Sequence, residues 1–190
     1  MPLDQEDLLA RVARGIGQSA AVGAERTDRS ITRQAAASFA VRPSGACSTM
    51  PTGFDPQAAM LFEAVIEAAF LVASADGEFD ETEQAAFVRV VQEACPDSSL
   101  STELGALVSD LSEQLAEDGL SQRVLCVAAP SFTEEQRREV LRVAALMAYV
   151  SGGVGEAERK VLEGLADGFR LGGPAVEDAI GLARDAMMAR

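Results

Sequence analysis

A thirteen-residue segment occurs twice in this chain, 75 residues apart, as LVASADGEFDETE at Leu71–Glu83 and as LMAYVSGGVGEAE at Leu146–Glu158. Five of the thirteen positions are identical, and each turn carries an apolar residue, Phe79 in the first copy and Val154 in the second. Apolar positions also match on both sides of the segment. We therefore expect two related helix–turn–helix hairpins that face each other across one core, in a pseudo-duplicated bundle.

The segments around the two copies carry the periodicity and the punctuation of helices. Asp55-Pro56 is typical of a helix start, and Thr133 followed three residues later by Gln136 is the pattern of a capping box. Proline or glycine after several apolar stripes predicts where those helices end. No alternating strand pattern competes, so the sequence predicts an all-α fold. The seven helices expected cover residues 55–75, 81–94, 102–117, 121–128, 133–150, 156–169 and 176–188.

Residues 1–53 differ in composition from residues 54–190, which we expect to form the all-α domain of about seven helices. A short amphipathic helix is expected over Gln5–Ile16, with an apolar stripe along one side. Residues 17–53 are rich in Gly, Ser, Thr and Arg, which predicts a partly flexible tail. The apolar stripe of the first helix either packs on its own domain, which is the favoured outcome, or docks on a partner.

The chain contains no histidine. Ser–His and Cys–His nucleophile pairs are therefore excluded, as are zinc and haem sites with histidine ligands. Three widely spaced cysteines, Cys47, Cys95 and Cys126, predict reduced thiols rather than a disulfide framework or a zinc site. The one lysine, Lys160, lies on a polar helix face beside Arg159. This inventory predicts a protein that is not an enzyme.

The net charge of −14 is concentrated after residue 50, where ten basic residues face 25 acidic ones. Such a domain repels nucleic-acid phosphates and anionic lipid headgroups, and it suits cations or basic protein partners. The acidic N-terminus is unlike a signal peptide, and glutamates interrupt the most apolar stretch. We therefore expect a cytoplasmic protein that does not span a membrane, binds no nucleic acid and has basic protein partners.

Five carboxylates crowd into the first turn, and capping explains only part of this cluster. Asp80 with Glu83 forms a capping box, and Glu81 complements the positive end of the same helix. Asp76 and Glu78 have no such role, and Asp76 stands at a helix C-terminus, where negative charge is disfavoured. An EF-hand is rejected because apolar residues fall at its first ligand positions. The turn is either a cation site or a well-capped connection between two helices.

An apolar helix that ends in ADG, followed by an apolar residue and an acid-rich helix start, resembles the TerB-like (tellurite-resistance) family, which includes the N-terminal domain of DjlA-type co-chaperones. The resemblance covers residues 61–182 and implies an all-α, non-catalytic module of duplicated hairpins. It also implies that the module binds divalent cations, with Ca²⁺ as the favoured ion, and assembles with stress-response proteins near the membrane. The family's acidic positions fall on Asp76, Asp80, Glu83, Glu156 and Glu158, while Ser151 replaces an acid of the second hairpin.

Two functions follow as hypotheses. The first is a TerB-like acidic adaptor or scaffold in a stress-response system that responds to weakly bound Ca²⁺ or Mg²⁺. Its candidate ligands are Asp76, Glu78, Asp80, Glu83, Glu156 and Glu158. The second is a structural protein–protein interaction module without an ion, which recruits its partner through the N-terminal tail.

Overall fold

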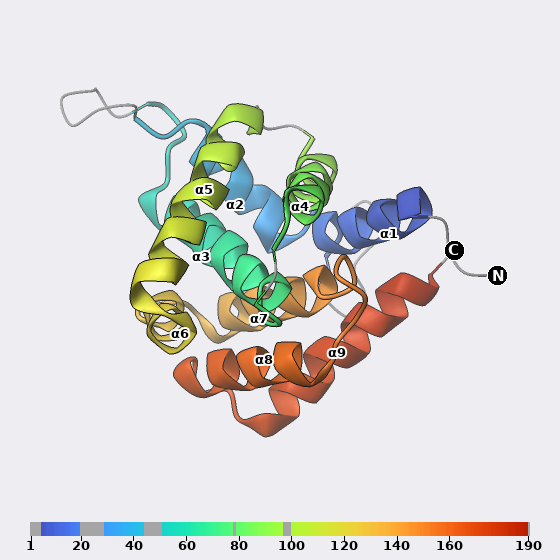
Figure 1. Cartoon of the computed structure of the whole chain (residues 1–190). Coiled ribbons are helices and arrows are strands. Elements are labelled where there is room, and N and C mark those ends of the chain that lie inside the picture. The colour runs from blue at the N-terminus through green and yellow to red at the C-terminus, as the bar shows by residue number, and fades with distance from the viewer. Residues whose placement is uncertain (1–4, 20–28, 44–50, 78, 97–99, 190) are drawn as a thin grey trace.

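The computed structural model describes residues 5–19, 29–43, 51–77, 79–96 and 100–189. Within these residues the chain forms nine α-helices and no β-strand, which confirms the all-α prediction (Figure 1). Two of these helices lie before residue 54, and one of them, over residues 5–17, falls where the amphipathic pattern predicts a helix. The helices are α1 (Gln5–Gly17), α2 (Ile31–Ala40), α3 (Pro56–Ala73), α4 (Glu81–Ala94), α5 (Ser101–Asp118), α6 (Leu120–Ala128), α7 (Glu134–Met147), α8 (Glu156–Gly168) and α9 (Gly173–Met188).

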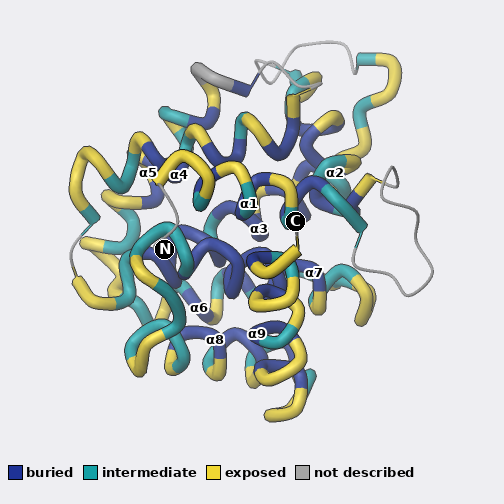
Figure 2. Tube along the Cα trace, turned by 90° about the vertical axis from the view of Figure 1, so that its right-hand side faces the viewer, coloured by how far each residue is buried: buried dark blue, intermediate teal, exposed yellow. Residues whose placement is uncertain are grey.

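Helix α3 runs through the centre of the molecule and packs against α2 and α7 (Figure 1). Twelve of its 18 residues are buried, and Figure 2 shows how the buried residues gather on the inner sides of the surrounding helices. Alanines on both α3 and α7 are fully covered, including Ala68, Ala69 and Ala144. Small side chains at these positions let the two helix backbones approach closely, so the core is built from tight helix contacts rather than from large aromatic residues.

The starts of α3 and α7 follow their local sequence signals. The Asp55 carboxylate accepts hydrogen bonds from the backbone N–H groups of Gln57 and Ala58, at 2.9 and 3.3 Å. Thr133 and Gln136 form the expected capping box, with hydrogen bonds of 3.2 and 2.9 Å between side chain and backbone in each direction. These caps satisfy N–H groups that the first helical turn leaves without partners.

Among the described residues, α3 is the one helix whose length and apolar composition would allow it to cross a membrane. Inside the fold, 67% of that helix is buried. Neighbouring helices cover its apolar side chains, so α3 serves as the core helix of the bundle rather than as a membrane span.

Helix α1 forms where the amphipathic pattern predicts it, and it packs on the rest of the fold against α4 and α9. Leu9, Val12 and Ile16 are buried. Gly17 permits the close approach to α4, because a Cβ atom at this position would lie 2.8 Å from the Ala94 carbonyl oxygen. The apolar stripe of α1 is thus used within the chain.

Helix α2 lies in the segment for which the composition predicts partial flexibility. Its Ser30 cap accepts a hydrogen bond from the Arg33 N–H group at 3.1 Å. Phe39 is fully buried, and its ring centroid lies 5.0 Å from that of Phe62 on α3. The Arg42 guanidinium lies over the Phe39 ring, 4.1 Å from the ring centroid. Burial against α3 stabilises this short helix, and local composition does not reveal such burial.

A buried ion pair on α7 joins both N-terminal helices to the core. Arg142 and Glu139, 5% and 7% exposed, make hydrogen bonds of 2.8 and 2.9 Å to each other. Glu139 also accepts a 2.8 Å hydrogen bond from the buried Thr32 hydroxyl of α2. Arg142 donates to the Gly15 carbonyl of α1 at 2.6 Å. One pair of charges therefore fixes α1, α2 and α7 relative to one another.

Two further arginines cap helix C-termini from a distance. Arg11 of α1 donates to the Met187 carbonyl at the end of α9, at 2.7 Å, and Arg137 of α7 donates to the Phe169 carbonyl after α8, at 2.6 Å. Neither α8 nor α9 has a basic residue in its own last turn. Cations near a helix C-terminus are favourable because the carbonyl groups there carry partial negative charge, so these arginines stabilise helices to which they do not belong.

Candidate functional site

The first predicted acidic turn connects α3 to α4, and two of its carboxylates, those of Asp80 and Glu83, cap α4. Asp80 is the N-cap of α4 and accepts a 2.8 Å hydrogen bond from the Glu83 N–H group, while the Glu83 carboxylate accepts one of 3.2 Å from the Asp80 N–H group. Asp76 is exposed, and Gly77 has a φ of 90°, the left-handed conformation that glycine adopts most readily. Glu78 lies outside the described residues.

The second turn, between α7 and α8, repeats part of this arrangement. Glu158 accepts a 2.8 Å hydrogen bond from the Gly155 N–H group, as Glu83 does from Asp80. Glu156 instead pairs with Lys160 at 2.8 Å on the exposed face of α8. Ser151, which stands in place of an acid, donates to the Ala148 carbonyl at 3.2 Å. The surviving glutamates of this turn therefore serve as a cap and as a surface ion pair.

The structure brings Asp80 and Glu83 together, and it gives Glu156 and Glu158 partners of their own. Among the described residues, no three side chains of Asp, Glu or Cys come together in a way that would hold a metal ion. The assignment of a cation to these carboxylates stays a prediction.

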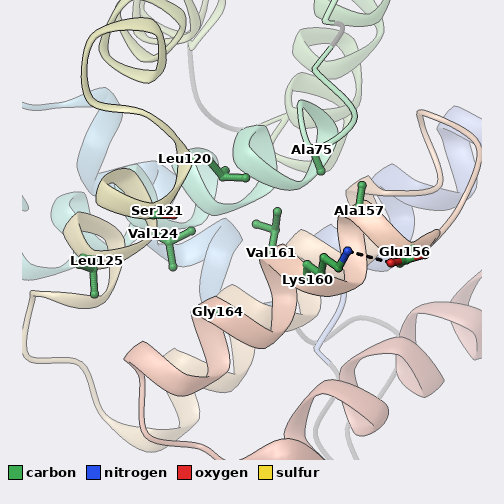
Figure 3. A pocket seen from close by; sticks show the side chains of 10 residues that line it. All are labelled: Ala75, Leu120, Ser121, Val124, Leu125, Glu156, Ala157, Lys160, Val161 and Gly164. Atoms are coloured by element: carbon green, nitrogen blue, oxygen red, sulfur yellow. Dashed lines mark hydrogen bonds and ion pairs between the residues drawn. The ribbon is translucent and has the colours of Figure 1, made fainter.

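A groove of about 820 Å³ lies beside the two turns, between α6 and α8 (Figure 3). We call it the α6–α8 groove. Leu120, Val124 and Leu125 of α6 form one wall, Ala157 and Val161 of α8 form the other, and Ala75 of the first turn closes one end. Its polar lining consists of Ser121 and the Glu156–Lys160 pair at the rim. The surface of the groove is therefore mainly aliphatic.

The groove narrows towards the C-terminal end of α8 because two glycines of that helix meet α6. A Cβ atom at Gly168 would lie 2.7 Å from the Ala128 Cβ atom, and one at Gly164 would lie 3.4 Å from Val124 Cγ1. The two helices are in tight contact at Gly168 and separate towards Ala157. The groove is therefore a consequence of how α6 and α8 cross.

Helix α6 is held in place by an ion-pair cluster with α3 and the end of α5. Arg123 of α6 contacts Glu67 of α3 at 2.5 Å and Asp118 at the end of α5 at 3.1 Å. Arg123 and Glu67 are each 13% exposed. Burial raises the pKa of the Glu67 carboxyl above its usual value, and the Arg123 guanidinium opposes that shift. This cluster orients α6, so that Leu125 points away from the core with 59% of its surface exposed.

A smaller groove of about 440 Å³, the α3–α5 groove, adjoins the first and lies between the α3–α4 turn and α5. Ala75 and Leu120 line both grooves, and Phe79 of the acidic turn lines the second. The Ser74 hydroxyl, also in its lining, is buried and has no hydrogen-bond partner among the residues that the structure describes. A buried polar atom of this kind is uncommon in a folded protein and marks this surface as one where a further polar group would fit.

Sequence reasoning pointed to the acidic turn and missed the groove beside it. One signal was present in the spacing of Gly164 and Gly168, which places two glycines one helical turn apart on one face of α8. Another signal was Leu125, a large apolar residue next to Val124 in a short helix. It adds to the two residues of that helix that are buried, Val124 and Val127. Of the three cysteines, Cys95 is buried and Cys126 is half-buried on α6 outside the groove lining, while Cys47 lies outside the described residues.

Comparison of the chain with models of known families, with curated proteins and with solved structures finds no match.

Proposed function

We propose that this chain is a non-catalytic helical interaction module, an adaptor that binds an apolar segment of a partner protein in the α6–α8 groove. The groove itself carries the proposal, because it offers about 820 Å³ lined mainly by aliphatic side chains and includes Leu125, which is 59% exposed. A single exposed leucine needs no explanation, whereas one that continues an apolar surface between two helices marks a binding site.

The lining of the groove favours binding over catalysis. A catalytic site needs a nucleophile, a base or an acid placed to act on one reacting atom. Here the polar groups are Ser121 and the Glu156–Lys160 pair, whose two side chains are 84% and 70% exposed. These two charged side chains are exposed to solvent and pair with each other.

The TerB-like relationship belongs to the same proposal, and the local geometry of the two hairpins supports it. Helices α4 and α8 begin at equivalent positions of the repeated segment, and a glutamate at the third helical position returns to the cap N–H in both. Val65 and its counterpart Val140 are both fully buried. A cytoplasmic adaptor in a stress-response system, which the resemblance implies, is the role we propose for such a module.

Dependence on a divalent cation is the second candidate, and what favours it is the position of the acidic turn. The α3–α4 turn borders both grooves through Ala75, so an ion held by the exposed Asp76 carboxylate would lie beside the binding surface. Calorimetric titration of Ca²⁺ and Mg²⁺ into the wild type and into the Asp76→Asn/Glu83→Gln double variant tests this. If binding heats are seen with the wild type and are lost in the double variant, the cation site is supported. If both proteins give equal heats, the cation site is rejected.

The groove is tested with a neutral probe. An 18-residue synthetic helix with leucine on one face and glutamine on the others is titrated into ¹⁵N-labelled protein, and amide shift changes are mapped. We expect changes in α6 and α8 that weaken in the Leu125→Ser variant and persist in Met60→Ser, a matched control that removes an apolar side chain 44% exposed on α3. If the amide shift changes are the same in Leu125→Ser as in the wild type, the groove is not the binding site.

A further inference from the structure

We propose that the segment taken by the α6–α8 groove is a basic amphipathic helix, with an apolar face about two turns long and lysine or arginine along its flanks. This inference rests on the proposed function and adds to it the conformation and the charge of the partner.

The shape of the groove fits a helix. The described residues form no β-strand to which an extended peptide could add, and two helices flank the site, which is the arrangement of helix-in-groove recognition. The α8 wall presents Ala157, Val161 and Gly164, spaced as successive positions on one helix face. At 1.5 Å per residue this wall is about 10 Å long, which matches roughly two turns of a docked helix.

The small residues of the α8 wall leave room for large side chains from the partner. Ala157 and Gly164 bring little volume of their own, whereas Leu125 projects from the facing helix with 59% of its surface exposed. A docked helix with leucine, methionine or phenylalanine at positions i, i+3 or i+4, and i+7 would fill the space over α8 and cover Leu125.

The charge around the groove selects a basic partner. Helices α5, α6 and α8 together carry nine carboxylates and three basic side chains. Each of the three basic side chains is already engaged: Arg123 with Glu67, Arg159 with Glu177 and Lys160 with Glu156. With nine acidic and three basic side chains, these helices carry a net charge of −6, so cationic side chains on the flanks of a docked helix meet opposite charge.

The same charge disfavours the other occupants of an apolar groove. A second copy of this chain would bring a net charge of −14 against the same carboxylates. An anionic lipid surface is repelled for the same reason. A basic amphipathic helix combines the two properties that the groove complements.

The experiment compares three synthetic 18-residue helices that share one leucine face and carry lysine, glutamine or glutamate elsewhere. A fourth peptide keeps the lysines and replaces the leucines with serine. Binding is measured by fluorescence anisotropy at about 50 and 500 mM salt. We expect the leucine–lysine helix to bind at least about tenfold more tightly than the leucine–glutamate helix at low salt, with a smaller ratio at high salt because screening weakens the charge contribution.

Variants of the protein place this binding in the groove. Leu125→Ser and Ala157→Trp, which fills the space over α8, should each weaken the leucine–lysine helix about tenfold, the loss typical of a central interface residue. Met60→Ser should leave the affinity unchanged. Far-UV circular dichroism of each variant verifies the fold, and Leu125 and Met60 are exposed enough that serine leaves the core intact.

The outcomes separate the two proposals. Equal groove-dependent affinity for the lysine and glutamate helices overturns the basic partner and leaves the proposed function standing. Binding of any leucine helix that neither groove variant weakens overturns both, as does equally tight binding of the lysine–serine peptide. A concentration-dependent dimer of the protein that Leu125→Ser abolishes assigns the groove to a second copy and overturns the peptide partner.

Discussion

The buried Arg142–Glu139 pair provides the sharpest test of how the N-terminal helices are held. Arg142→Met keeps most of the side-chain volume and removes the guanidinium. It takes away two hydrogen bonds to Glu139, of 2.8 and 2.9 Å, and one of 2.6 Å to the Gly15 carbonyl. The Glu139 carboxylate then stays 7% exposed beside the Thr32 hydroxyl without its counter-charge.

The expected cost follows from that uncompensated charge. Removing one member of a buried pair costs about 3–5 kcal/mol, a large part of the roughly 5–15 kcal/mol that stabilise a typical domain. Removing both charges is far less costly, because no ionised group is left in the interior. The double variant Glu139→Leu/Arg142→Met should therefore be more stable than Arg142→Met alone, although Thr32 loses its acceptor.

The assay is urea unfolding followed by far-UV circular dichroism, with Arg138→Met as the matched control. Arg138 is on the same helix, but its side chain is 47% exposed and pairs with Glu134 and Asp178 at the surface. We expect the control to cost less than about 1 kcal/mol. Hydrogen exchange should show the amides of α1 and α2 losing protection in Arg142→Met before those of α3. If Arg142→Met and Arg138→Met unfold at the same urea concentration, the buried pair does not hold these helices and the reasoning is wrong.

Three further outcomes are expected. Gly168→Ala forces a methyl group against α6 and should cost about 1–3 kcal/mol in urea unfolding. Gly105→Ala in α5, where a Cβ atom meets no described atom within 4 Å, should instead stabilise by up to about 1 kcal/mol. A gain in stability from Gly168→Ala would contradict the tight crossing of α6 and α8. Asp80→Ala removes the N-cap of α4 and should cost about 1 kcal/mol in the same assay, and no loss would mean that the cap is dispensable. The hydrogen bond from Arg159 lowers the pKa of the Glu177 carboxyl, so the stability that this pair contributes is present above the ordinary glutamate pKa and is lost as the pH falls through the lowered one. Carbon-detected NMR titration should give a higher Glu177 pKa in Arg159→Gln than in the wild type, and an unchanged value would remove the pair as the cause.

Helices with local start and stop signals could be predicted from the sequence, and helices that depend on distant burial could not. Asp55-Pro56 and the Thr133 capping box fixed two starts to within a residue, because capping involves neighbours in the chain. Helix α2 has one large apolar residue that is fully buried, Phe39, and its burial depends on Phe62 in another helix. In sequence, the alanine- and serine-containing composition of α2 resembles that of a polar tail, and only the packing against α3 shows that part of it is buried.

The charged pair on α7 was hidden for a similar reason. Glu139 and Arg142 belong to the run EEQRREVLR, whose density of charge is typical of a solvent-exposed face. Their burial depends on the Thr32 hydroxyl and on the carbonyl groups at the end of α1, more than 100 residues away in the chain. No local pattern contains that information.

In the candidate site too, the features that depend on neighbouring residues could be predicted from the sequence, and those that depend on distant residues could not. Capping by Asp80 and Glu83 could be anticipated because it involves residues three positions apart. The α6–α8 groove is formed by two helices from different parts of the chain, and its shape depends on where Gly164 and Gly168 touch α6. The sequence directed attention to the turn at the edge of this surface, where Ala75 closes the groove.

The arginine of α1 that caps α9 has a consequence for how the protein is made. Arg11 precedes its acceptors, the carbonyl groups of Met187 and Ala189, by 176 and 178 residues in the chain, so it is synthesised long before them. Helix α1 can dock on α4 before α9 has been synthesised, but its contacts with α9 form only once α9 has left the ribosome. A nascent chain stalled before α9 would therefore present an incompletely covered α1, and a truncation that removes Met187 and Ala189 would loosen α1.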